Sequence, residues 1–224
     1  MRKTALVVLA LFALPLLAAE DNRNTITVTG SGNVKVAPDR VSFTVGVMTT
    51  KPTVREAFAE NNAKTQRVVD ALKARGVKAP EIQTSNFSVS QETNDMGRPT
   101  GRYVVSNMVT VTREDPKGVS DLLQAAIDAG ANEAGNLRFF ISNPSEAQNR
   151  ALEKAYRDAR ASAERLAAVA GKALGDAMTI TTAPAYFGYA QNNVAENITV
   201  TAAPAIETGV VDTNASVTVT FELK

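Results

Sequence analysis

Six alanines recur at every fourth residue in the second half of this 224-residue chain, and this repeat constrains the fold more than any other feature. They lie within residues 145–170, which read as one long helix with Ser145 as its expected N-cap and Gly171 at its end. Side chains at i, i+4 spacing form a ridge, and small ones let another element approach within the short end of the roughly 8–10 Å range. The ridge consists of Ala147, Ala151, Ala155, Ala159, Ala163 and Ala167.

Two features are candidates for an interface. The alanine ridge packs either on the protein's own sheet, which we favour, or against a second copy of the chain. Residues 183–215 include no Lys or Arg, and loops longer than about 12–15 residues are usually functional or disordered. Aromatic side chains in this segment suit either a partner surface or ordinary burial. The candidate interface residues are therefore the six alanines of the ridge together with Tyr186, Phe187 and Tyr189.

The remaining chain alternates between strand and helix patterns. Helical spacing predicts helices at 54–75 and 117–129, besides the one at 145–170. Period-two alternation predicts strands at 41–48, 82–91, 102–113, 137–141, 178–181 and 216–223, and one at 26–36 that is kinked at Gly30-Ser31-Gly32. We therefore predict an α+β fold with mixed sheets and one long Ala-rich helix. It contains a βαββ unit at about 40–113, a linking helix at 117–129 and a second βαββ unit at about 135–224.

The N-terminus reads as an export signal. Arg2 and Lys3 precede 16 uncharged residues that end in Ala18-Ala19, before Glu20. This pattern is typical of a secretory signal peptide, here residues 1–19. A membrane span needs about 20 apolar residues, so we expect cleavage and no stable membrane span in the mature chain. The mature chain of 205 residues would carry 22 basic and 23 acidic side chains.

Composition excludes much familiar chemistry. The chain has no Cys and no His, which removes disulfides, thiolate nucleophiles, imidazole bases and the usual zinc ligands. No basic excess is present to bind a phosphate backbone, so no nucleic-acid partner is expected. The carboxylates of the two long helices alternate with Lys and Arg, which is the pattern of a solvated face. We predict no catalytic residues, no cofactor and no metal.

An alternative function rests on a few polar positions. Asn61 and Thr65 lie on the apolar stripe formed by Val54, Phe58, Val68 and Leu72 of the helix at 54–75. They are either core polar groups bonded to a neighbouring backbone, the commoner outcome, or the edge of a site. With the polar loop at 93–101, they motivate a periplasmic small-molecule or ion-binding module, or a carboxylate-dependent enzyme.

Several stretches together resemble the SIMPL-domain family. The resemblance is carried by residues 26–32, Pro38-Asp39, the strand from Gly101 to Val111 with Asn107 inside it, 128–132, 155–160 and 204–206. It implies one SIMPL domain over residues 20–224 with paired βαββ architecture, exported to the cell envelope, without established catalytic residues. It also implies a tendency of some bacterial relatives to form ring-like oligomers, an indirect link to oxidative-stress tolerance, and use of the domain as an interaction module. We therefore expect a non-enzymatic periplasmic protein that self-associates. An envelope protein is a further candidate partner, and the exported protein could also associate with the outer membrane.

Overall fold

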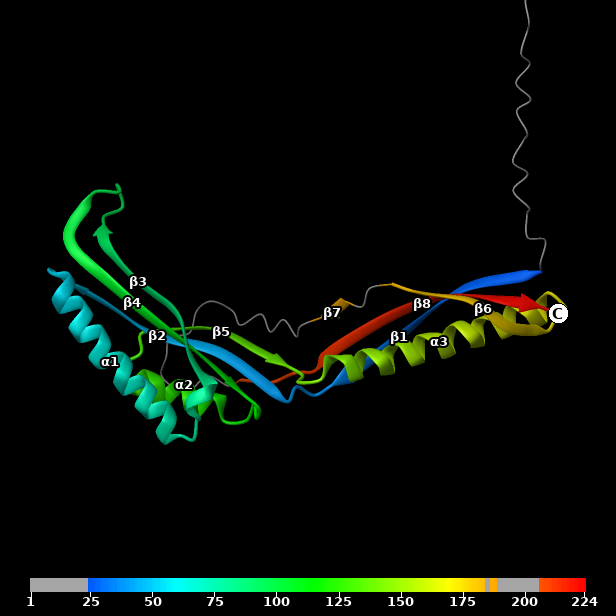
Figure 1. The fold of residues 1–224 in the computed structure, drawn as a ribbon, viewed down its shortest axis with the longest axis horizontal. Helices are drawn as coiled ribbons and strands as arrows, with labels where there is room; N and C mark the ends of the chain where they lie inside the picture. The colour runs from blue at the N-terminus through cyan, green and yellow to red at the C-terminus, as the bar shows by residue number, and fades with distance from the viewer. Residues whose placement is uncertain (1–23, 184–185, 189–205) are drawn as a thin grey trace, which may run out of the picture.

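The computed structural model describes residues 24–183, 186–188 and 206–224. Figure 1 shows an elongated molecule in which two sheets lie end to end, each with helix along one of its faces. The signal peptide predicted at residues 1–19 lies outside the described residues. In the described part, no helix is both long and apolar enough to cross a membrane.

The first sheet, sheet B, has the strand order β3-β4-β2-β5 and carries α1 and α2 on one face (Figure 1). Its core forms because alternate residues of β2, including Phe43, face Leu72 of α1 and Leu122 of α2. α1 begins where the Thr53 hydroxyl accepts the N–H of Glu56, which caps the helix. The elements of this lobe are β2 (Arg40–Lys51), α1 (Val54–Ala74), the 3-10 turn η1 (Ala79–Glu81), β3 (Ile82–Thr93), β4 (Pro99–Arg113), α2 (Val119–Asp128) and β5 (Glu133–Phe140).

The second sheet, sheet A, has the order β1-β8-β6, with β7 also paired to β8. The long helix α3 packs along β1 and β8. The predicted cap at Ser145 is wrong, because Asn143 caps α3 by accepting the N–H of Glu146. Pro144 and Ser145 lie in the first turn, where the N–H that proline lacks is not needed. The elements of this lobe are β1 (Thr25–Val36), α3 (Pro144–Val169), β6 (Leu174–Thr182), β7 (Tyr186–Gly188) and β8 (Val211–Leu223).

The glycines of β1 lie where the backbone of α3 touches the strand. A Cβ added to Gly30 would lie 2.2 Å from the carbonyl oxygen of Ala155, and one on Gly32 would lie 2.0 Å from that of Ala151. β1 nevertheless pairs with β8 in unbroken register from Thr25 to Val36, so the predicted kink is wrong. These glycines allow close approach of a helix and do not interrupt the strand.

The α+β class is confirmed, but the sheets are not mixed. Every strand ladder within the described residues is antiparallel. β5, the first strand of the predicted second βαββ unit, pairs with β2 of sheet B, because Phe139 of β5 is buried in the core of that sheet. β1 instead takes the place beside β8, so each sheet combines strands that are distant in sequence.

A carboxylate links the two connections between the sheets. Asp39, between β1 and β2, accepts the N–H of Ser142 at 2.7 Å and the Ser142 hydroxyl, between β5 and α3. These hydrogen bonds hold the pKa of Asp39 below its ordinary value. The ionised carboxylate therefore ties together the two segments that join sheet B to sheet A.

Candidate functional site

The alanine ridge lies inside the molecule. All six alanines are 0–3% exposed and face sheet A of the same chain. The favoured packing on the protein's own sheet is therefore what the structure contains, and a contact between copies through the ridge is incompatible with it. The ridge is needed internally because β1 approaches the helix backbone at Gly30 and Gly32.

The aromatic segment is only partly described. Tyr186 and Phe187 belong to β7, whose backbone pairs with Asn214 and Thr213 of β8, whereas Tyr189 lies outside the described residues. The use of these aromatic residues as an interface stays a prediction.

Asn61 is a core polar group, and Thr65 is buried beside it and also lines a smaller hollow of about 280 Å³. The Asn61 side chain is buried and donates to the carbonyl oxygens of Val47 at 2.6 Å and Val105 at 2.9 Å, and its own oxygen accepts from Thr65. The amide thus ties α1 to β2 and β4, as the commoner of the two alternatives predicted.

The polar loop that supported the same alternative is a self-contained turn. The Asn94 side chain accepts the N–H groups of Met96 and Arg98, so the loop uses its own polar groups to close the β3–β4 hairpin.

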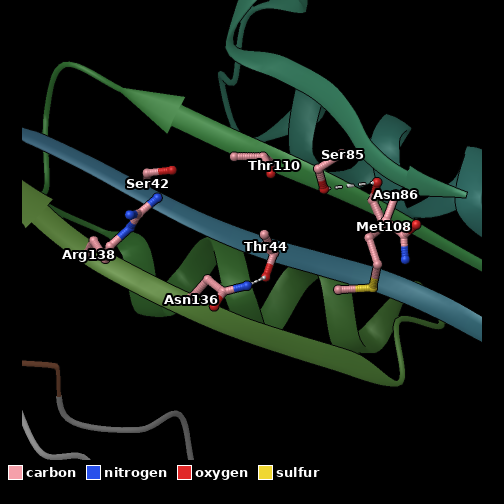
Figure 2. A pocket seen from close by; sticks show the side chains of 8 residues that line it. All are labelled: Ser42, Thr44, Ser85, Asn86, Met108, Thr110, Asn136 and Arg138. Carbon is pink, nitrogen blue, oxygen red and sulfur yellow. Dashed lines mark hydrogen bonds between the residues drawn. The ribbon is translucent and has the colours of Figure 1, made fainter.

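The face of sheet B opposite its helices contains a hollow of about 560 Å³ (Figure 2). This volume lies within the range of about 300–1,000 Å³ typical of ligand sites. Side chains from all four strands line it, and most carry a hydroxyl or an amide. They are Ser42, Thr44, Ser85, Asn86, Met108, Thr110, Asn136 and Arg138.

A β-bulge shapes one wall of the hollow. The register between β2 and β5 shifts between Ser42 and Thr44, and Asn136 adopts a left-handed conformation with φ of 52°. This conformation is uncommon for a residue other than glycine. The Asn136 amide donates to the Thr44 hydroxyl at 3.3 Å, and that hydroxyl donates to the Gly135 carbonyl at 2.9 Å. The bulge thereby fixes an amide and a hydroxyl at the wall.

The floor of the hollow depends on Gly46. A Cβ on this residue would lie 2.1 Å from the sulfur of Met108, so the thioether lies directly across the glycine. Met108 supplies an apolar surface among polar neighbours.

Arg138 provides the only charge among the eight lining residues. It stands opposite Ser42 in the β2–β5 ladder, and Figure 2 shows its guanidinium reaching toward that serine. Among the residues the structure describes, no hydrogen bond or ion pair to the Arg138 side chain is found. A guanidinium has five donors suited to carboxylate or phosphate, and here they remain available.

An apolar strip lies on the other face of sheet B, at the edge that α1 leaves uncovered. Its residues come from α1 and from β3 and are 42–49% exposed, and the rings of Phe58 and Phe87 meet edge to face at 6.1 Å. The predicted stripe of α1 is therefore buried only at Val68 and Leu72. We call Val54, Phe58, Phe87 and Val89 the apolar strip.

The charged groups near α1 form surface pairs. Lys51 and Lys64 lie 2.6 and 2.7 Å from the two carboxylate oxygens of Glu60 and lower the pKa of Glu60 to about 2. Within residues 24–183, 186–188 and 206–224, no group of three His, Cys, Asp or Glu side chains could hold a metal ion.

Comparison with known proteins places the chain in a family. The family model described as SIMPL, protein of unknown function (DUF541), matches residues 26–221. The chain is 30% identical over 188 residues to the 26 kDa periplasmic immunogenic proteins of Brucella melitensis biotype 1 and Brucella abortus, covering 79% of this chain and 75% of theirs. It is 24% identical over 158 residues to the uncharacterized protein YggE of Edwardsiella ictaluri, covering 69% of this chain and 66% of that protein. The match over nearly the whole chain, together with the two helix-covered sheets, makes this protein a member of the SIMPL family.

Proposed function

We propose that the chain is an exported, periplasmic, non-enzymatic protein that acts through its surfaces and assembles with copies of itself. The periplasmic names of the two Brucella relatives and the N-terminal signal pattern support export. The absence of Cys and His from the sequence supports a role without catalysis. Self-assembly is the specific part of the proposal and rests on the edge strand β3.

The observation that carries self-assembly is the contrast between two long edge strands. On β1, the Asp158 carboxylate of α3 accepts the N–H of Ser31 at 3.0 Å, and Lys154 donates to the carbonyl of Asn33 at 3.0 Å. Charged side chains thus occupy part of that edge, which is a common protection against strand addition. β3 ends sheet B and has no charged residue from Ile82 to Gln91.

The apolar strip supports the same edge as a contact surface. Phe87 and Val89 are 49% and 43% exposed and lie on β3 itself, beside Phe58 of α1. Antiparallel pairing of β3 with β3 of a second copy would join two sheets and cover both strips about a twofold axis. The second copy is therefore the occupant that we propose for this edge.

Light scattering coupled to size-exclusion chromatography of residues 20–224 tests the assembly. At tens of micromolar the chain should elute as an oligomer, because a standard interface of about 1,600 Å² normally survives such dilution. Phe87→Lys should release monomers, because it places a charge at the centre of the proposed contact. Ile180→Lys is the matched control, since Ile180 is 55% exposed on a strand of sheet A.

A monomeric parent chain would refute assembly, and equal dissociation by both variants would refute the role of β3.

Release of the chain by osmotic shock, with a mature N-terminus at residue 20, tests export separately. An indirect link to oxidative-stress tolerance belongs to the same proposal. It predicts that the Phe87→Lys variant fails to restore peroxide survival to a deletion strain, whereas the Ile180→Lys variant restores it.

A further inference from the structure

We propose that the hollow on the open face of sheet B binds a small acidic sugar, with Arg138 holding its carboxylate. This site lies on the face of sheet B opposite the apolar strip. Ser85 and Asn86 of β3 belong to its lining, whereas assembly through β3 would use the backbone edge and the opposite face of that strand. The argument rests on the charge, the donor and acceptor groups and the shape of the hollow.

The charge favours an anion. Arg138 is the one charged residue among the described residues that line the hollow, and none of those residues is acidic. Two carboxylates of this lobe have partners of their own, since Glu133 of β5 accepts from Ser106 and Glu114, which follows β4, pairs with Arg40 at 3.1 Å. A carboxylate entering the hollow would thus meet an available guanidinium, which binds such groups through two parallel hydrogen bonds.

The uncharged groups favour a hydroxylated ligand over a bare anion. Ser85, Thr110 and Ser42 carry hydroxyls, and Asn86 and Asn136 add amides. Some of this capacity is used inside the protein, because the Ser85 hydroxyl donates to the Met108 carbonyl, the Ser42 hydroxyl accepts from Thr112 and the Asn136 amide donates to Thr44. Sugar hydroxyls both donate and accept, so they can bind the donor and acceptor positions that these groups leave open. A simple anion such as acetate would leave them to water.

The shape is consistent with a small ligand. The Met108 thioether lies across Gly46, where it offers an apolar patch to the carbon face of a sugar ring. The bulge at Asn136 holds a non-glycine residue at φ of 52°, and uncommon backbone conformations of this kind cluster at ligand sites. The hollow is open and polar, so we expect millimolar rather than nanomolar affinity.

Titration of residues 20–224 with glucuronate, followed by amide NMR at low salt, tests the site. We expect binding with shifts concentrated at the side-chain amides of Asn86 and Asn136. Glucose and acetate should each bind at least about tenfold more weakly, because each lacks one of the two recognised features. Arg138→Gln should weaken glucuronate about tenfold or more, since a hydrogen bond to a charged group is lost.

Arg150→Gln, which removes an exposed arginine from α3 in the other lobe, is the matched control and should leave glucuronate affinity unchanged. Arg138→Lys keeps the charge without the two-pronged geometry and should give an intermediate affinity. Absence of glucuronate binding overturns the proposal, as do shifts clustered outside the hollow or an Arg138→Gln variant with parental affinity. Acetate binding as tight as glucuronate, or tighter binding of a short peptide through its terminal carboxylate, also overturns it.

Discussion

The contact between α3 and β1 predicts that Gly30→Ala destabilises the protein, although alanine is intrinsically the better strand residue. The new Cβ would lie 2.2 Å from the Ala155 carbonyl oxygen and 2.4 Å from the Ala159 nitrogen. The first of these distances is more than 1 Å inside the 3.4 Å at which ordinary contact begins. Both obstacles are backbone atoms, so no side-chain rotation can relieve them and the helix itself must move away from the sheet.

The expected magnitude follows from two opposing terms. Replacing glycine inside a strand by alanine contributes about 0.5–1 kcal/mol of stability through the unfolded chain. Overpacking of a well-packed contact costs about 1–3 kcal/mol, and here the cost lies at or above the upper end because a 26-residue helix must shift. The net loss is therefore about 2–3 kcal/mol, or a Tm lower by about 4–12 °C for a chain of this size.

Urea unfolding followed by circular dichroism measures the loss, with the midpoint shifted and the slope unchanged. Hydrogen exchange should locate it, with protection lowered in α3 and retained in α1. Gly135→Ala is the control, because its Cβ would meet only the Thr44 hydroxyl at 3.9 Å, and it should be neutral or slightly stabilising. A Gly30→Ala variant as stable as the parent, or one rescued by Ala159→Gly, would refute the close packing of the helix backbone on the strand.

Three further predictions concern sheet B. Asn61→Leu should cost about 2–5 kcal/mol in urea unfolding, since the buried carbonyls of Val47 and Val105 both lose their donor, whereas Gln66→Leu on the exposed face of α1 should not. Glu60, whose pKa is lowered to about 2, stabilises the fold above its ordinary value of 4.5, and this contribution is lost as the pH falls from 4.5 to 2. Glu60→Gln should therefore be less stable than the parent at neutral pH and equal to it near pH 2, and a constant difference across that range would contradict this. Asn136→Ala should lower stability by about 1 kcal/mol or more in the same assay because alanine tolerates the left-handed conformation poorly, and Asn136→Gly should recover part of the loss.

The sequence indicates the helices and strands more directly than it indicates the hollow on sheet B, because the hollow depends on pairing between distant strands. Ser42, Thr44 and Thr110 occupy the polar positions of alternating strands, which the sequence pattern already assigns to one face of each strand. Nothing local indicates that Arg138 stands opposite Ser42, because that pairing joins strands separated by almost a hundred residues and passes through a bulge. The exposure of Phe58 was equally hidden, since its helical spacing from Val68 and Leu72 is that of a buried stripe.

The sequence by itself determined most of the local choices: three helices, most strands and the α+β class. These depend on side-chain periodicity and on hydrogen bonds between near neighbours, which act within a few turns of chain. The absence of Cys and His, and with it the exclusion of thiol and imidazole chemistry, needed only the composition.

Only the tertiary structure decided which strands share a sheet and which faces stay open. β5 joins β2 because Phe139 finds an apolar core there, and β1 joins β8 because its glycines admit the backbone of α3. The same alanine pattern suits an internal sheet and a second copy equally well, since burial responds to any apolar partner at the right distance. Whether the ridge packs on its own sheet or on a second copy depends on which apolar surfaces of the whole folded chain bury one another best. No short stretch of sequence contains that information.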